Sequence, residues 1–442
     1  MGNLLSRLTI VLAALVVLNL QGCATSAQKS SGMRNALATG QFDKALAEVE
    51  KEAGSDDVMV NMNLGMLRRL NGDYKGSNAA FEKAKNQIEA LYSTSISEQA
   101  GAVMVNDETI SFEGDRYEQV LVHAYMAMNF IDMGDLDSAR VEILQADVKM
   151  MEWGETPEED PFMRYLAGIV FEALGDDDDA LVSYRKAVKV YQKTRDRQGF
   201  GVPVQVREAY FRMLARNGLR NELSTAKKEF GMTNWQRPDT RGQGELVMIL
   251  NNGLSPQRHQ KAFQTWSTEM SMNIRIAVPD YPQPPRYVPR VKMSVNGQNA
   301  LLETVENIDG LARASLSDDM PVITARAIAR AVVKKKSEKE AGERSGGLAQ
   351  LAMLVVNTAT EIADTRCWNT LPQEIQLARA WLPEGQYPVT FEVIAEGGRV
   401  VDRFTRKVTI KAGRKTIIID HWLAPNTTRG SVLSTANSGG RY

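Results

Sequence analysis

The sequence predicts a chain in two parts: an α-helical repeat solenoid, followed by a mixed α/β domain that ends in a small antiparallel β-sheet or sandwich. Three observations support this prediction. A glycine-centred helical pattern recurs between residues 34 and 235, the composition changes near residues 234–244, and alternating apolar residues mark short strands after residue 372. A length of 442 residues also favours two domains over one.

The first 22 residues predict a lipoprotein signal peptide. Arg7 supplies a positive charge, and residues 8–20 form an apolar run that is too short to span a membrane. The run leads into Leu20-Gln21-Gly22-Cys23. This ending resembles the lipobox of bacterial lipoproteins, which implies a mature chain that begins at Cys23 and carries acyl chains such as palmitate there. Ala24, in place of Asp, implies by the same resemblance the outer membrane, with the protein facing the periplasm. Residues 23–33 are expected to form a polar tether.

Paired helices are expected throughout residues 34–235. In each copy of the pattern a glycine turn is followed by an aromatic or apolar residue, a small alanine and a large apolar residue at helical spacing. The glycine turns the chain, the alanine lets two helices approach, and the large residue fills the space behind it. The glycines are Gly40, Gly72, Gly134, Gly175 and, in a degenerate fifth copy, Gly218.

The pattern resembles the tetratricopeptide repeat, whose helix pairs must stack to bury their apolar faces. Successive glycines from Gly40 to Gly175 are 32, 62 and 41 residues apart, whereas that family repeats every 34 residues. The longest gap is therefore expected to hold an inserted element at about residues 86–118.

The resemblance also implies a concave face, lined by the first helix of each pair, as a binding groove for a protein partner. Methionine side chains there would adapt to varied partners, and an apolar groove suits an amphipathic helix or an extended peptide. In the alternative interpretation, the insertion at residues 86–118 fills the groove and the same residues are core. The expected groove residues are Met59, Met62, Met66, Arg69, Leu121, Met128, Phe162, Tyr165 and Ile169.

Residues 236–424 are expected to form the mixed α/β domain. Buried strands are predicted at 245–250 and 274–278, and a hairpin from Val291 to Val305 around Asn296-Gly297, a pair that suits a type I′ turn. Further strands are predicted at 375–381, 388–395, 400–410 and 416–421, and a disordered tail at 425–442.

Two helices are expected between these strands. One runs from Pro321 to Glu340, where Arg326, Arg330 and Lys334 share one face that is predicted to be solvated. The other, Leu348–Ala363, is nearly uncharged and is predicted to be a buried core helix because it is too short to span a bilayer.

The sequence shows no clear catalytic centre and no motif for a cofactor. The formal net charge of -1 argues against a nucleic-acid binder, and the three histidines lack metal-ligand spacing. The acidic run Asp176–Asp179 is expected to start a helix rather than bind a cation. Cys367 beside Arg366, with the distant His421, is the one candidate for an activated thiol, although a small buried residue is the simpler interpretation.

Two stretches resemble a family of largely uncharacterised proteobacterial outer-membrane lipoproteins with tetratricopeptide-like N-terminal halves. The first runs from Glu113-Gly114-Asp115-Arg116-Tyr117-Glu118 into residues 123–129, and the second is Ala363–Pro372. The resemblance implies a role in envelope biogenesis or secretion. The sequence therefore predicts a non-enzymatic, lipid-anchored scaffold or adaptor that binds a periplasmic or outer-membrane protein. The alternative is an envelope hydrolase or transferase with its site in the C-terminal domain.

Overall fold

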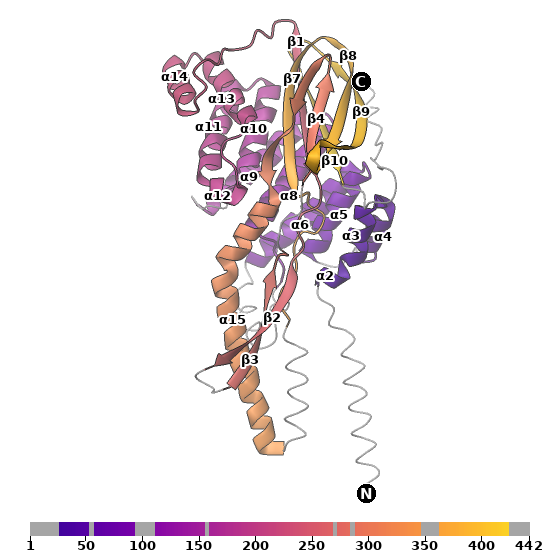
Figure 1. Ribbon diagram of the computed structural model, residues 1–442, viewed down its shortest axis with the longest axis vertical. Helices are drawn as coiled ribbons and strands as arrows, with labels where there is room; N and C mark the ends of the chain where they lie inside the picture. The colour runs from indigo at the N-terminus through magenta and orange to yellow at the C-terminus, as the bar shows by residue number, and fades with distance from the viewer. Residues whose placement is uncertain are drawn as a thin grey trace.

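The computed structural model describes residues 26–52, 57–92, 111–154, 159–267, 272–282, 288–345 and 362–423. Cys23, the expected tail and residues 348–361 of the expected core helix lie outside these ranges. Figure 1 shows a helical array beside two β-sheets, with a long helix and a β-hairpin projecting from one end.

Five antiparallel helix pairs make up the first half of the described chain. A glycine turn joins the two helices of each pair, and all five predicted glycines have left-handed backbones with φ between 71° and 88°. The degenerate copy at Gly218 is therefore a true helix pair. The pairs are α3 (Ser31–Ala38) with α4 (Phe42–Glu50), α5 (Val58–Leu70) with α6 (Tyr74–Tyr92), α8 (Arg116–Asp132) with α9 (Leu136–Glu152), α10 (Pro161–Leu174) with α11 (Asp177–Lys193), and α13 (Val204–Arg216) with α14 (Arg220–Glu229).

Small residues bring the two helices of a pair together, as the repeat pattern predicts. The predicted alanines Ala139 and Ala180 are fully buried. Glycines on the first helix have the same role, because a Cβ at Gly65 would lie 2.4 Å from the ring of Phe81, and one at Gly168 would lie 2.3 Å from the ring of Tyr184. The array is thus packed by tetratricopeptide-like contacts between small and aromatic residues.

The expected tether is largely helical. Residues Ser26–Lys29 form α2, and α3 begins at Ser31. Ser26 and Ala27 are buried, and the backbone N–H of Ala27 donates a hydrogen bond to Oγ1 of Thr365 (3.4 Å). Only residues 24 and 25 separate Cys23 from Ser26, where the first described helix begins.

Two four-stranded sheets form a sandwich in the second half. One is mixed, in the order β10-β1-β7-β6, with β10 parallel to β1, and the other is antiparallel, in the order β5-β4-β8-β9. The parallel pair corrects the expectation of a purely antiparallel sheet. The strands are β1 (Gln243–Asn252), β4 (Arg290–Val295), β5 (Gln298–Leu301), β6 (Glu303–Asn307), β7 (Glu374–Pro383), β8 (Gly385–Ile394), β9 (Val400–Ile410) and β10 (Lys415–Trp422); β2 (His259–Ser267) and β3 (Met272–Asp280) form a separate hairpin, and the short helices are α12 (Arg195–Gln198) and η3 (Glu396–Gly398).

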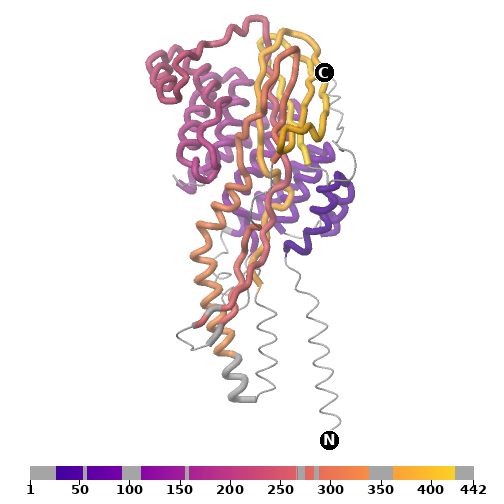
Figure 2. The backbone as a smooth tube through the Cα atoms, viewed as in Figure 1, coloured from indigo at the N-terminus to yellow at the C-terminus, as the bar shows by residue number. Residues whose placement is uncertain are grey.

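The mixed sheet is covered on both faces. Leu246 and Met248 of β1 face the other sheet, where they pack with Phe391 of β8. Val247 and Ile249 belong instead to the large core that the helix pairs form. The repeats and the mixed sheet therefore share one core. The layers follow in the order helices, mixed sheet and antiparallel sheet (Figures 1 and 2).

Two predicted elements differ from the structure. The expected hairpin contains the Asn296-Gly297 turn, with φ of 47° and 75°, but its second run divides at Leu302, so that β5 and β6 lie in different sheets. The expected helix at Pro321 is part of α15 (Ile308–Ser345), which begins 13 residues earlier. Its first turns form because Leu311, Ala312 and Leu316 recur at helical spacing and are buried in the large core.

The face of α15 that was predicted to be solvated is largely buried. Arg330 is fully buried, Lys334 is nearly so, and Arg326 is half-buried. The reason is that Ala327 and Ala331 on this side of the helix pack against the β2–β3 hairpin. Within the described residues, no helix is long and apolar enough to cross a membrane.

Candidate functional site

The nine residues predicted to line a partner groove do face inward, from α5, α8 and α10, but they are core residues. Eight of them are buried, and Met59 is half-buried. The prediction of an open groove is therefore wrong for the part of the chain that the structure describes. The buried residues are Met62, Met66, Arg69, Leu121, Met128, Phe162, Tyr165 and Ile169.

The chain's own mixed sheet fills this groove. Val247 of β1 and Leu377 of β7 belong to the same core as the groove residues. The hydroxyl of Tyr125 in α8 donates a hydrogen bond to Oδ1 of Asn251 (2.9 Å), and the hydroxyl of Tyr191 in α11 donates one to the carbonyl oxygen of Val305 (2.7 Å). Among the described residues, the groove is therefore filled by β-structure from the second half. Residues 93–110 of the insertion, which the alternative interpretation placed in the groove, lie outside the described ranges.

The stretch Ala363–Pro372 also helps to fill the groove. Trp368 is buried, with its ring edge-on to Phe81 (5.6 Å between centroids) and Tyr125 (5.8 Å). Its backbone N–H donates a hydrogen bond to Oε1 of Glu118 (2.7 Å), a carboxylate in the first family-like stretch. Burial, with a smaller contribution from the charge of Asp115, raises the pKa of Glu118 to about 7. The two stretches therefore contact each other and join the repeats to the segment before β7.

A buried charge cluster links α10 to three strands of the sheet. Arg379 of β7 bridges Glu245 of β1 (2.6 Å) and Glu172 of α10 (3.0 Å), and Lys415 of β10 contacts both carboxylates. Arg212 of α13 lies within 3.5–3.8 Å of the same two groups. Burial alone would raise the pKa of both carboxyls, but the charges of Arg379 and Lys415 outweigh it. They hold the pKa of Glu172 at about 2 and that of Glu245 well below its usual range.

A second acidic site lies at the same interface, and the pKa values of its carboxyls are raised instead of lowered. Asp160, which caps α10 by accepting a hydrogen bond from the N–H of Met163 (2.6 Å), lies near Glu306 of β6. Only Gln198 donates a side-chain hydrogen bond to Glu306 among the described residues (2.7 Å). Burial raises the pKa of Asp160 to about 6 and that of Glu306 well above its usual range. Burial therefore favours the protonated forms of Asp160 and Glu306, whereas the neighbouring cations favour the ionised forms of Glu172 and Glu245.

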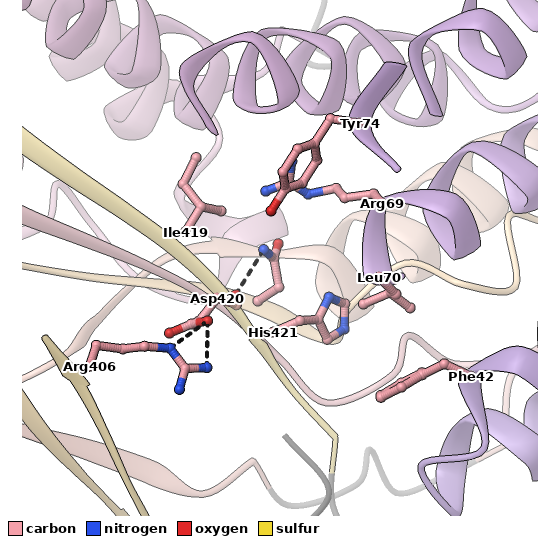
Figure 3. Close-up of a pocket in the computed structure, with 9 residues that line it drawn as sticks. Phe42, Arg69, Leu70, Tyr74, Arg406, Ile419, Asp420 and His421 are labelled. Carbon is pink, nitrogen blue, oxygen red and sulfur yellow. Dashed lines mark hydrogen bonds and ion pairs between the residues drawn. The ribbon is translucent and has the colours of Figure 1, made fainter. Parts of the chain in front are cut away.

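Two polar pockets open at the edges of the interface. One, of about 370 Å³, lies beside the charge cluster and is lined by Trp381, Lys415 and Arg216 among others. The other, of about 60 Å³, is shown in Figure 3, where Arg406 pairs with Asp420 (2.9 Å) and His421 lies near Leu70. Burial lowers the pKa of His421 to about 3, so this histidine is neutral at physiological pH and is a poor proton donor.

The candidate thiol is not activated. Cys367 is buried, and burial raises the pKa of its thiol to about 11. Its Sγ contacts Oδ1 of Asn369 (3.7 Å), and Arg366 forms an ion pair with Asp364 (2.7 Å). A thiol that stays protonated is a weak nucleophile, so the Cys367 form of the enzyme hypothesis loses its reactive group.

The remaining candidates for chemistry are structural. Nδ1 of His123 in α8 lies 2.9 Å from the carboxylate of Glu142 in α9, and Lys85 of α6 contacts the same carboxylate (3.1 Å). The acidic run Asp176–Asp179 begins α11, as expected. Among the described residues, no group of three or more His, Cys, Asp or Glu side chains is placed to hold a metal ion.

The outer face of the array carries an apolar stripe that sequence reasoning missed. Val141, Leu144, Val148 and Met151 of α9 follow one another at spacings of 3, 4 and 3 residues and are 50–61% exposed. The opposite side of α9 is buried through Ala139, Ile143, Ala146 and Met150. The signal was present in the sequence, since α9 has apolar residues on both faces where a surface helix normally has them on one.

Comparisons with known proteins add only a likeness to helical repeats. No protein-family model matches the chain, and no curated protein matches it. Among solved structures, MamA aligns with a TM-score of 0.31 and 14% identity over 45% of this chain and 92% of MamA. A Podospora anserina kinesin light chain with nearly identical TPR-like repeats gives a TM-score of 0.32 and 13% identity over 47% of this chain and 92% of the other. A Rap conjugation regulator of plasmid pLS20, bound to a Phr* peptide, gives 0.29 and 14% over 46% of this chain and 53% of the regulator. The tetratricopeptide-like arrangement therefore rests on the helix pairs of the chain itself.

Proposed function

We propose that this protein is a non-enzymatic scaffold or adaptor of the cell envelope, anchored by lipid to the outer membrane, facing the periplasm and binding a protein partner on the outer face of its repeats. The observation that carries the proposal is the exposed apolar stripe of α9, formed by Val141, Leu144, Val148 and Met151. The mixed sheet fills the inner face of the repeats. On the outer face, α9 exposes apolar residues at helical spacing.

The neighbouring outer helices support this choice. Glu82 and Glu89 are exposed on α6, and Arg185 and Lys189 are exposed on α11. The α9 stripe runs between these charged helices and spans ten residues, or about 15 Å of helix. An amphipathic helix of the partner, with its own apolar residues at i, i+3 and i+7, would match this length and spacing.

The anchor rests on the sequence, since Cys23 lies outside the described residues. Cys23→Ala should leave an unprocessed precursor, or a soluble form if another peptidase cleaves it. Cells labelled with palmitate, followed by membrane fractionation, would test this expectation. Label that persists in the variant would contradict the anchor.

The partner surface is tested by placing a photo-crosslinking amino acid at residue 144 in cells. The expected result is a discrete crosslinked band that disappears when Val141, Val148 and Met151 are changed to Glu. The matched control changes Val182, Arg185 and Lys189 of α11 to Glu, and the crosslink at residue 144 should survive. A band that persists in the α9 variant, while both variants show wild-type circular dichroism and melting, would overturn the proposal.

A further inference from the structure

The helix α15 and the β2–β3 hairpin together form an arm that projects from the body, away from the sandwich (Figures 1 and 2). The hairpin pairs residues 259–267 with 272–280 in an unbroken antiparallel register. Ile274, Ile276 and Val278 of β3 pack against Ala327 and Ala331 of α15. The arm is therefore a packed unit of helix and hairpin, and nine residues of extended strand make it about 30 Å long from its root.

The described chain begins at the root of this arm. Gln257, two residues before β2, donates hydrogen bonds to the carbonyl oxygen of Ala27 (3.0 Å) and to Oγ of Ser30 (2.7 Å). Arg34 of α3 donates hydrogen bonds to the carbonyl oxygens of Ser255 (2.8 Å) and Asn369 (2.6 Å). These contacts fix α2 and α3 to the segment from which the arm starts, on the side of the body from which the arm projects (Figure 1).

The distance from the anchor to this root is short. Cys23 precedes Ser26 by three residues, which reach about 10 Å when fully extended. The arm is about three times as long. A membrane surface that holds an acyl group on Cys23 therefore lies closer to the root than the end of the arm does. Because the arm projects on the side where α2 lies, it can reach a membrane surface held this close to its root (Figure 1).

The outer surface of the arm suits that position. Trp266 of β2 is 59% exposed and lies on the hairpin face turned away from α15. Phe263 (43% exposed) pairs with Ile276 and lies on the opposite face, which packs against α15. Val322 and Ile328 of α15 are also exposed. Aromatic side chains, tryptophan above all, favour the interface between phospholipid headgroups and acyl chains. Arg275 of β3 and Lys336 of α15 are exposed on the same arm and suit contact with anionic headgroups.

We infer that the arm is a second membrane contact, in which Trp266 inserts into the headgroup region of a phospholipid surface, with Arg275 on the same hairpin face, while the acyl group on Cys23 holds the root. This inference rests on the proposed lipid anchor. A single acyl anchor leaves a protein free to tilt, whereas two separate contacts fix its orientation. The repeats and their α9 stripe would then be held at a constant height above the membrane.

Tryptophan fluorescence gives a direct test, because Trp266 is the most exposed tryptophan of the chain. The acylated full-length protein is placed in vesicles of phosphatidylethanolamine and phosphatidylglycerol that contain a phospholipid brominated near the top of its acyl chains. The bromines should quench part of the emission, and Trp266→Phe should abolish this quenching. Arg275→Glu, on the same hairpin face as Trp266, should reduce it strongly. Val400→Glu, on β9 of the sandwich and 44% exposed in the wild type, should leave it unchanged.

Palmitate label on the same preparation separates the two proposals. With label present, an absence of quenching, or quenching that Trp266→Phe does not change, overturns the arm contact and leaves the anchor intact. With label absent, the anchor is wrong, and the arm contact is then decided by adding the same vesicles to the unacylated chain. In that case an absence of quenching overturns the arm contact too. Protection of Trp266 in cells without lipid-dependent quenching in vesicles would assign the arm to a protein partner instead.

Discussion

The inner and outer faces of the helical array both carry apolar residues at helical spacing, yet their surroundings differ completely. On the inner face, Met62 and Met128 are fully buried beneath the chain's own sheet. On the outer face, Leu144 and Met151 are at least half exposed. The comparison teaches that periodicity identifies an apolar face but does not say whether the chain itself or another molecule covers it.

The largest contrast is expected when both faces are given the same charges. Changing Met62, Met128 and Tyr165 to Glu should prevent folding, because each buried carboxylate costs several kcal/mol against a total stability of about 5–15 kcal/mol. Changing Val141, Leu144 and Met151 to Glu should leave the melting temperature within a few degrees of the wild type. Circular dichroism melts of the two triple variants would compare them. A folded inner-face variant would show that the groove opens in solution.

A smaller but still large effect is expected at the buried charge cluster, which joins helix α10 to the mixed sheet. Arg379→Met removes one of the cations that contact both Glu245 and Glu172, and it should destabilise the protein by about 3 kcal/mol because two buried carboxylates lose a partner and keep only Lys415 and Arg212. The matched control is Arg185→Met, which breaks the exposed Arg185–Glu222 pair (2.8 Å) and should cost less than about 1 kcal/mol. Urea unfolding of both variants measures the difference. Equal losses would contradict the structural role of the cluster.

Substitutions at two glycines compare a tightly packed position in α10 with an open position in α3. Gly168→Ala places a methyl group against the ring of Tyr184, so a loss of about 1–3 kcal/mol is expected from overpacking. Gly32→Ala in α3 meets nothing within 4 Å and should instead stabilise the helix by about 0.5–1 kcal/mol. Opposite signs in denaturant unfolding would confirm the close packing of α10 on α11. A gain at both positions would mean that the ring of Tyr184 moves aside without cost.

The helix pairs could be predicted from sequence because their turns need glycine at a left-handed position, and Gly72, Gly134 and Gly175 are such positions. Most strands could be predicted from alternation or from a continuous apolar run, but β2 (His259–Ser267) was not predicted. The contact between the two halves could not, since it joins Tyr125 to Asn251 and Glu172 to Arg379 across long stretches of chain. One signal was available: residues 246–250 are continuously apolar, which is typical of a strand covered on both faces. Because the second sheet covers only one face, the helices had to cover the other.

The candidate site was harder to predict than the fold. The expectation for α5, α8 and α10 transferred a binding groove from the tetratricopeptide resemblance, and no residue in those helices distinguishes a groove from a core. The start of α15 was missed because Pro321 was taken as a helix start, whereas the buried Leu311 and Leu316 extend the helix ahead of it. Arg330 was misplaced because charge alone predicts exposure, while the β2–β3 hairpin covers it.

The smallest expected effect concerns pH, and it contrasts the two acidic sites of the interface. Asp160 and Glu306 have raised pKa values in the folded protein because of burial, and the backbone N–H of Phe162 interacts with both. A raised pKa means that the folded state holds protons that the unfolded state has released. The stability that Asp160 contributes is therefore fully present below about pH 4 and is lost as the pH rises through about 6, and the contribution of Glu306 is lost as the pH rises through its own raised pKa. Glu172 and Glu245, with lowered pKa values, behave in the opposite way and lose their contribution as the pH falls from about 4.5 towards about 2.

Glu306→Gln tests this assignment, because the amide keeps the shape of the side chain and cannot ionise. At pH 4, where the wild-type carboxyl is already neutral, the variant should have nearly the wild-type free energy of unfolding. At pH 8 it should be more stable by about 1 kcal/mol, since the buried charge, or the like charge facing Asp160, is gone. Glu245→Gln is the matched control at the ionised site and should be destabilising at pH 8, because Arg379 and Lys415 lose a charged partner. Urea unfolding at the two pH values measures both effects. If the Glu306 variant is less stable than the wild type at pH 8, this carboxylate is ionised and held by a favourable partner. The two acidic sites would then be alike.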